Sequence, residues 1–146
     1  MNEPTPEKIE QFLKLGRVIL GIPDTWKINI QMENRPGYAD SIAITTSNPR
    51  YMVSTIEFSP DVLTEEIQTR AIHILHELIH VSAAEVHHIC CEILDLLPEE
   101  KRKIYSDFYT DANERLTEKS ARALINFLAA NTEIINALND PTKSDQ

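Results

Sequence analysis

The feature of this sequence that most restricts its fold is the position of its glycines. Only Gly16, Gly21 and Gly37 occur in 146 residues, so the backbone freedom that glycine provides lies early in the chain. Without glycine to interrupt them, the remaining residues, roughly one hundred, favour helix. We therefore expect strands and turns near the N-terminus and helices after them.

The segment before residue 59 predicts one helix and three strands. Thr5 is a candidate N-cap and Pro6 occupies the first helical position, an apolar stripe follows, and Pro23 stops the helix. Three stretches after it alternate apolar and polar residues with a period of two, separated by the turn-like NRPG and SNPR. These are WKINIQM (26–32), SIAITT (41–46) and YMVSTIEF (51–58), which we expect to form a mostly antiparallel meander.

Helix signals fill the sequence from Ser59 to Asp140. No internal repeat, linker or low-complexity segment divides the chain. Length and a hydrophobic content of 42% predict one α+β domain over residues 1–140, with a frayed polar tail at 141–146. We expect four helices in this segment. The first begins at Ser59 or Asp61 and runs through Val81, and the second begins at a Ser82–Glu85 capping box. The third begins at Pro98, and the fourth runs from Thr110 or Asp111 to about Ala130.

The charge and hydropathy of the chain argue against two classes of binding partner, nucleic acids and membranes. A net charge of −9, with basic residues scattered except at Lys101–Lys103, argues against nucleic-acid binding. No signal peptide is visible and no apolar run reaches the ~18 to 20 residues that span a bilayer, so we expect a cytoplasmic protein without membrane contact. Cys90 and Cys91 are adjacent and lack CxxC spacing, which makes them apolar fillers of a helix. The sequence gives no oligomeric state.

All five histidines lie between residues 73 and 88, and two of them form an H-E-x-x-H motif. On a helix, His76 and His80 project from one face about one turn apart, which lets two imidazoles reach one Zn²⁺. Glu77 lies beside them, where it is placed to take a proton from a water whose pKa zinc has lowered toward ~7. The other interpretation is a surface helix whose histidines pair with carboxylates.

The third ligand is open at this level. The metzincin pattern H-E-x-x-H-x-x-G-x-x-H requires glycine and histidine where this chain has Ala83 and Val86. His87 and His88 follow closely, but the capping box expected at Ser82 reorients the chain before them. Exposed or hydrogen-bonded histidines are the simpler interpretation, so we do not expect them to be ligands.

A later helix offers carboxylates instead. Glu114 and Glu118 lie four residues apart on one face, so Glu114 is a candidate to complete a His₂Glu site and Glu118 to accept the other ring N–H of a ligating histidine. Each also has an ordinary explanation. With Asp111 as N-cap, Glu114 completes a capping box at N3, and Glu118 is a solvated residue.

The two motifs together resemble those of known enzymes. HELIH followed by NERLTE resembles the gluzincin branch of the zincin metallopeptidases, whose thermolysin-like members pair H-E-x-x-H with N-E-x-x-S-D; here Thr117 replaces the serine and Glu118 the aspartate. The layout is similar to that of small stand-alone zincin-like proteins of phages and mobile elements. Glu114, Glu118 and Ala121 match the E-x-x-x-E-x-x-A of ImmA/IrrE-type peptidases. The resemblance covers residues 71–80 and 111–124.

The resemblance implies a zincin-like fold and a zinc-dependent metallopeptidase acting on peptide or protein substrates. By it, His76, His80 and Glu114 hold one zinc per chain, Glu77 is the general base and Glu118 supports a ligand. In zincins the strand bordering the cleft pairs with the substrate, a role open to SIAITT or TIEF. His73, Tyr105 and Tyr109 are candidate donors to the developing oxyanion. The alternative function is a non-catalytic, metal-stabilised binding or regulatory module of a mobile element.

Overall fold

The computed structural model describes residues 6–32 and 42–131 of the chain, and within them it is an α+β fold. Two short 3₁₀ helices, η1 (Pro49–Tyr51) and η2 (Pro60–Leu63), accompany the main elements. The expected cap at Thr5, the NRPG turn and the polar tail at 141–146 lie outside the described residues. The main elements are α1 (Pro6–Ile19), β1 (Lys27–Met32), β2 (Ala43–Asn48), β3 (Val53–Phe58), α2 (Ile67–Ser82), α3 (Ala84–Asp95) and α4 (Glu99–Ala130).

The three strands form a mixed sheet in the order β1-β3-β2, and the predicted antiparallel meander is wrong. β3 pairs with β1 in parallel and with β2 antiparallel. The last strand takes the centre because its inward face is the most completely buried: Ser54, Ile56 and Phe58 are all 0% exposed. A period of two predicts a strand and its buried face, but neither its neighbour nor their relative direction.

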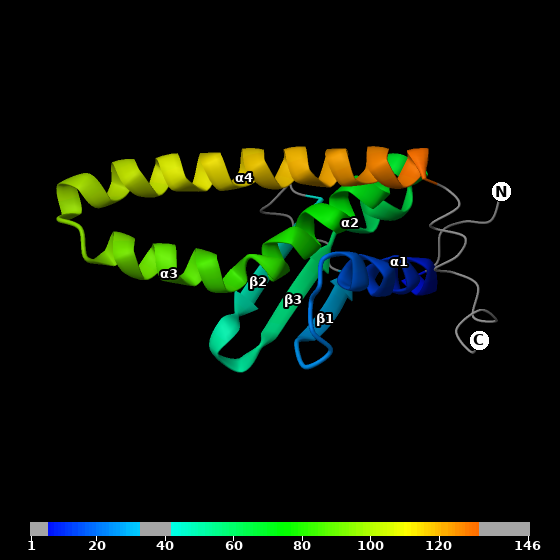
Figure 1. Cartoon of the computed structure of the whole chain (residues 1–146), viewed down its shortest axis with the longest axis horizontal. Helices are drawn as coiled ribbons and strands as arrows, with labels where there is room; N and C mark the ends of the chain where they lie inside the picture. The colour runs from blue at the N-terminus through cyan, green and yellow to red at the C-terminus, as the bar shows by residue number, and fades with distance from the viewer. Residues whose placement is uncertain (1–5, 33–41, 132–146) are drawn as a thin grey trace.

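α2 is the central element of the fold. It lies between the sheet and α4, and α1 packs beside it (Figure 1). Its apolar stripe explains this position, because Ala71, Ile74, Leu75 and Leu78 recur at helical spacing and are buried. The helix that carries the H-E-x-x-H motif is therefore fixed on several sides.

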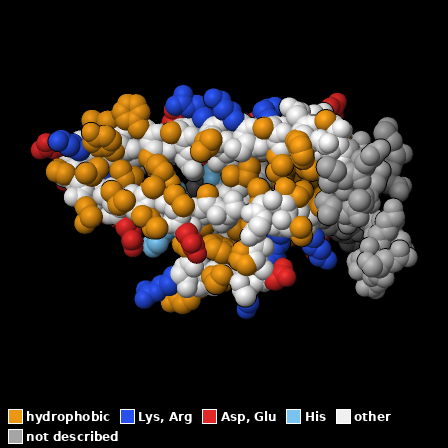
Figure 2. All heavy atoms as spheres, viewed as in Figure 1, with side chains coloured by type: hydrophobic (Ala, Val, Ile, Leu, Met, Phe, Trp, Pro, Cys, Tyr) orange, Lys and Arg blue, Asp and Glu red, His pale blue; other side chains and the backbone are white. Residues whose placement is uncertain are grey.

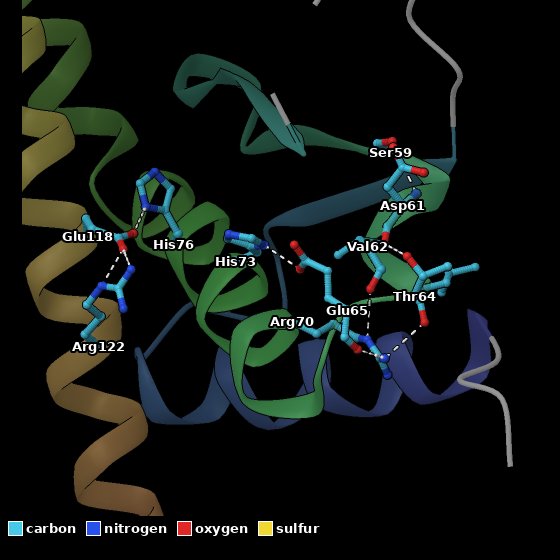
Figure 3. Close-up of polar contacts among 11 residues, drawn as sticks. Ser59, Asp61, Val62, Thr64, Glu65, Arg70, His73, His76, Glu118 and Arg122 are labelled. Carbon is cyan, nitrogen blue, oxygen red and sulfur yellow. Dashed lines mark hydrogen bonds and ion pairs between the residues drawn. The ribbon is translucent and has the colours of Figure 1, made fainter. Parts of the chain in front are cut away.

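The start of α2 differs from the prediction. Ser59 accepts a hydrogen bond from the Asp61 backbone N–H at 3.3 Å, but this caps η2, and α2 itself begins only at Ile67. Arg70 then donates to three backbone carbonyl oxygens of the preceding segment, including that of Val62 at 2.9 Å. Figure 3 shows this guanidinium closing the turn, which sets the direction in which α2 leaves it.

Two predicted helix caps are absent from the described structure. Ser82 donates to the Ile79 carbonyl at 2.8 Å instead of capping α3, whose N-cap position is Ala83 without a side-chain hydrogen bond. α4 is one helix of 32 residues, so the two helices expected from Pro98 and from Thr110 or Asp111 are continuous. Nothing in the segment 99–130 is glycine or proline, and helix propensity carries through the polar stretch.

We predict that Leu78→Ala destabilises the fold by about 2–5 kcal/mol, since it leaves a cavity in a close-packed core. Leu78 is 0% exposed on α2, and it faces α1 so closely that a Cβ on Gly16 would lie 2.4 Å from its Cδ1. The matched control is Leu116→Ala, because Leu116 is 66% exposed, and we expect it to change stability by less than about 0.5 kcal/mol. Urea unfolding followed by circular dichroism measures both. Equal effects of the two substitutions would contradict this description of the core.

Within the part of the chain that the structure describes, no helix combines the length and apolar character needed to cross a bilayer.

Candidate metal centre

α2 presents the two histidines of the motif side by side. His76 and His80 are four residues apart, and their Nε2 atoms lie 3.0 Å from each other. Both rings are partly buried, with side-chain exposures of 17% and 20%. The helical arrangement predicted from H-E-x-x-H is therefore present.

α4 brings Glu114 to the same point. Its Oε2 lies 3.2 Å from Nε2 of His76, and its Oε1 lies 3.3 Å from Nε2 of His80. Because α4 is continuous through this region, Glu114 is 15 residues past the first residue of the helix, Glu99, and the capping-box explanation of this residue is wrong. The carboxylate faces both imidazoles across the α2–α4 contact.

Glu118, one turn along α4, contacts the other nitrogen of His76. Its Oε2 is 3.3 Å from Nδ1 of His76, and its Oε1 accepts from Nε of Arg122 at 2.6 Å. Figure 3 shows these three side chains in line between α2 and α4. A hydrogen bond donated from Nδ1–H to Glu118 leaves the Nε2 lone pair of His76 directed at His80 and Glu114. That is the tautomer a metal ligand needs.

The charges of the cluster agree with this arrangement. Burial is the largest effect on His80 and lowers its pKa, with His76 adding to the decrease against the opposing attraction of Glu114 and Glu77. Burial would raise the pKa of Glu118, but the hydrogen bond and charge of Arg122, followed by those of His76, bring it below its usual value. A neutral imidazole beside ionised carboxylates is the protonation state that binds a divalent cation.

The donor set fits a zinc ion. One ligand atom from each of His76, His80 and Glu114 can be chosen so that all lie within 4.8 Å of one another. Tetrahedral zinc with bonds of ~2.0–2.1 Å places neighbouring ligand atoms about 3.3 Å apart. The two Nε2 atoms lie 3.0 Å apart, and the 3.2 Å and 3.3 Å separations from His76 and His80 are to different oxygens of Glu114. Two nitrogens and one oxygen also leave a fourth position for water or substrate.

Glu77 is buried and points to the same side of α2. It is 7% exposed, and its Oε2 accepts a hydrogen bond from the Thr45 hydroxyl at 2.7 Å. The same hydroxyl lies 3.4 Å from the Glu77 carbonyl oxygen. β2 therefore holds the carboxylate in one orientation, at the edge of the histidine cluster.

A cleft of about 630 Å³ opens over these groups. β2 forms one wall from Ala43 to Ser47, α3 contributes His87, His88 and Cys91 to another wall, and the floor contains the cluster together with Glu77. The volume lies in the range of ~300–1,000 Å³ typical of ligand pockets. An extended substrate placed in the cleft would lie along β2.

Two of the three predicted oxyanion donors, His73 and Tyr105, lie away from the cleft. His73 binds Glu65 through Nδ1 at 2.7 Å, points away from His76 (Figure 3), and is not among the described residues that line the cleft. Tyr105 is 52% exposed on α4, away from the same lining. Neither is placed to act as the oxyanion donor we predicted.

Tyr109 is not among the described residues that line the cleft, but it contacts His87, which is. Its hydroxyl lies 3.0 Å from Nδ1 of His87, and burial, with smaller contributions from Cys90 and Cys91, raises the pKa of Tyr109 to about 12. The phenol of Tyr109 therefore keeps its proton near neutral pH. His88 pairs with Glu92 at 3.4 Å, so His87 and His88 line the cleft but lie outside the three-residue ligand cluster.

Two contacts of the site were missed from sequence. Arg122 lies four residues after Glu118, and the i,i+4 rule for opposite charges on a helix could have found it. Thr45 is 32 residues from Glu77 on a strand whose polar positions carry no comparable signal. A contact of that kind depends on how the sheet docks on α2.

We expect Thr45→Val to destabilise the protein by about 1–3 kcal/mol, because it leaves a buried carboxylate oxygen without its donor. Thr45→Ser restores the hydroxyl and should restore most of the stability. Thr46→Val, on the exposed side of the same strand, is the matched control. Chemical denaturation of the three variants measures the difference, and equal stability of the Thr45→Val and Thr46→Val proteins would show that the bond to Glu77 contributes nothing.

No family model, curated protein or solved structure matches this chain in the comparisons we made. The assignment of the site therefore depends on its own geometry and on the two motifs.

Proposed function

We propose that this protein is a zinc-dependent metallopeptidase. The observation that supports it best is the convergence of His76, His80 and Glu114 from two helices, with one ligand atom of each within 4.8 Å of the others and the glutamate of the H-E-x-x-H motif beside them. A site that binds metal only to stabilise the fold does not require a buried carboxylate beside its ligands. Zinc bound here would polarise a carbonyl group and lower the pKa of a water molecule.

The side chains of the chain have separate roles in this proposal. Glu77, oriented by Thr45, removes a proton from the attacking water and returns it to the leaving amine. His76, His80 and Glu114 hold the ion, and Glu118 keeps His76 in the ligating tautomer. The open fourth position of the ligand set is the feature that separates a catalytic site from a closed structural one.

The sheet favours an extended peptide as the substrate. β2 is the edge strand beside the cleft and, among the described strands, pairs only with β3. Its free edge offers backbone groups to which a peptide can add as a further strand. TIEF lies in β3 at the centre of the sheet, so of the two candidate edges only the SIAITT strand fits this role.

Zinc-loaded protein incubated with a mixed peptide library should cleave internal peptide bonds, detected by mass spectrometry, and a chelator should stop the reaction. The alternative, a metal-stabilised binding module, is separated by a hydroxamate inhibitor, which needs an open coordination position. Binding of the hydroxamate to the zinc-loaded chain supports the peptidase. A zinc-loaded chain that neither binds hydroxamate nor cleaves any peptide would favour the binding module.

A further inference from the structure

The α3–α4 hairpin extends away from the core without a core of its own. α3 and the first half of α4 project beyond the sheet and α2 as a two-helix arm (Figure 1). No residue from 85 to 116 is buried. Isolated helices of this length are marginal in water, and tertiary packing supplies most of a helix's stability. The arm therefore lacks the packing that would ordinarily hold it.

The arm carries large apolar side chains that face solvent. On α3 they follow spacings of three, four and three residues, which places them on a single stripe. On α4 the apolar side chains of Ile104, Tyr105 and Phe108 are exposed. Figure 2 shows hydrophobic side chains gathered across both helices of this region in one view. We define the hairpin face as Val86, Ile89, Ile93, Leu96, Ile104, Tyr105 and Phe108, which are between 52% and 85% exposed.

The area of the hairpin face matches what a stable dimer needs. Half-exposed side chains of this size offer on the order of 100 Å² each, so the seven together present roughly 700 Å², against about 800 Å² per partner in a standard interface. Contiguous apolar patches larger than a few hundred Å² are rare on monomers. The spacing on α3 is also the a/d spacing with which helices pack in bundles.

The charges around the hairpin face favour one orientation of two arms. α3 carries Glu85, Glu92 and Asp95 and no lysine or arginine, whereas the basic residues 101–103 lie together near the start of α4. The same half of α4 also carries acidic residues, which are Glu99, Glu100, Asp107, Asp111 and Glu114. Figure 2 shows basic side chains along the outer edge of α4 and acidic ones along the opposite edge at α3. A two-fold axis parallel to the arm places each α4 over the partner's α3, so that the basic residues 101–103 meet the last turn of the partner's α3, which is acidic.

We infer that the chain forms a homodimer through the hairpin face, in which each α4 packs antiparallel on the partner's α3 in a four-helix bundle. The interface is self-complementary, as a two-fold axis requires. It leaves the metal centre accessible, because Glu114 and Glu118 lie on the side of α4 that contacts α2. The inference is independent of the proposed function.

Sedimentation velocity of the full chain over a concentration series tests this. The wild type should sediment as a dimer of twice the 16.7 kDa chain mass, and Leu96→Asp or Phe108→Asp should raise the dimer Kd by at least about 100-fold. Val18→Asp, at an equally exposed apolar position on α1, should leave the dimer intact. Circular dichroism of each variant verifies that it is folded.

A charge exchange tests the orientation. Glu92→Lys lies in the last turn of α3 and Lys101→Glu in the first turn of α4, where each new charge suits the helix dipole and does not weaken the monomer. Each alone should weaken the dimer and the double variant should restore it. A folded wild type that stays monomeric at every concentration would overturn the inference. So would a monomer that floats with lipid vesicles, because the hairpin face would then bind a membrane. So would a dimer that the hairpin-face substitutions leave unchanged, and failure of the double variant to recover would reject the α4-on-α3 arrangement.

Discussion

Glu77→Gln is expected to lower the rate of peptide hydrolysis by about 10² to 10⁴-fold while zinc affinity stays within a few-fold of the wild type. Glutamine has the same shape as glutamate, and its carbonyl oxygen still accepts the hydrogen bond from Thr45, so the fold and cleft are preserved. What it loses is the ability to take a proton from water. Hydrolysis of a peptide selected from the library, followed by chromatography, measures the rate, and calorimetry measures zinc binding.

The matched control for Glu77→Gln is Glu100→Gln, since Glu100 lies exposed in the first turn of α4. We expect this control to cleave at the wild-type rate. A Glu77→Gln enzyme as active as the control would remove Glu77 from the mechanism. Loss of zinc in Glu77→Gln would instead show that this residue helps to hold the ion.

Glu114→Ala is expected to weaken zinc binding by more than about 100-fold, because losing only an outer hydrogen-bonding partner of a ligand already costs about 10–100-fold. Glu118→Ala should fall within that smaller range, since its carboxylate contacts Nδ1 of His76 and not the ligand cluster itself. Competition with a chromophoric chelator measures both affinities.

Asp107→Ala controls for loss of negative charge near the site. Asp107 lies seven residues before Glu114, on the same side of α4, and is exposed. It should leave zinc affinity unchanged. If Glu114→Ala behaved like this control while His87→Ala abolished binding, the third ligand would be His87 from the cleft wall.

Much of the local structure was predictable from sequence because it depends on near neighbours. Period-two alternation located the three strands, and the apolar stripe located α2 around Leu75. The strand order was not predictable, since burial of β3 on its inward face depends on α1 and α2 packing against the sheet. The division of α4 at Asp111 was wrong because an aspartate begins a helix as its N-cap only where the preceding residues are not already helical.

The site was likewise predictable where it depends on near neighbours in the sequence. The pairing of His76 with His80 follows from helical spacing alone, and the choice of Glu114 follows from its match to a second motif. Which further groups reach the cleft depended on tertiary packing. His73 was a candidate donor to the oxyanion, yet its Nδ1 contacts Glu65 at 2.7 Å and it does not line the cleft. His87 was discounted, yet α3 leads it along the cleft wall.

The zinc content of the purified full chain is the measurement that most directly tests the central claim. After dialysis against metal-free buffer, elemental analysis should find about one zinc per chain in the wild type and close to none in His76→Ala and His80→Ala, with circular dichroism verifying that all three are folded. A folded wild-type chain that binds no zinc, or a His76→Ala chain that retains a full equivalent, would contradict the metal centre and the peptidase with it.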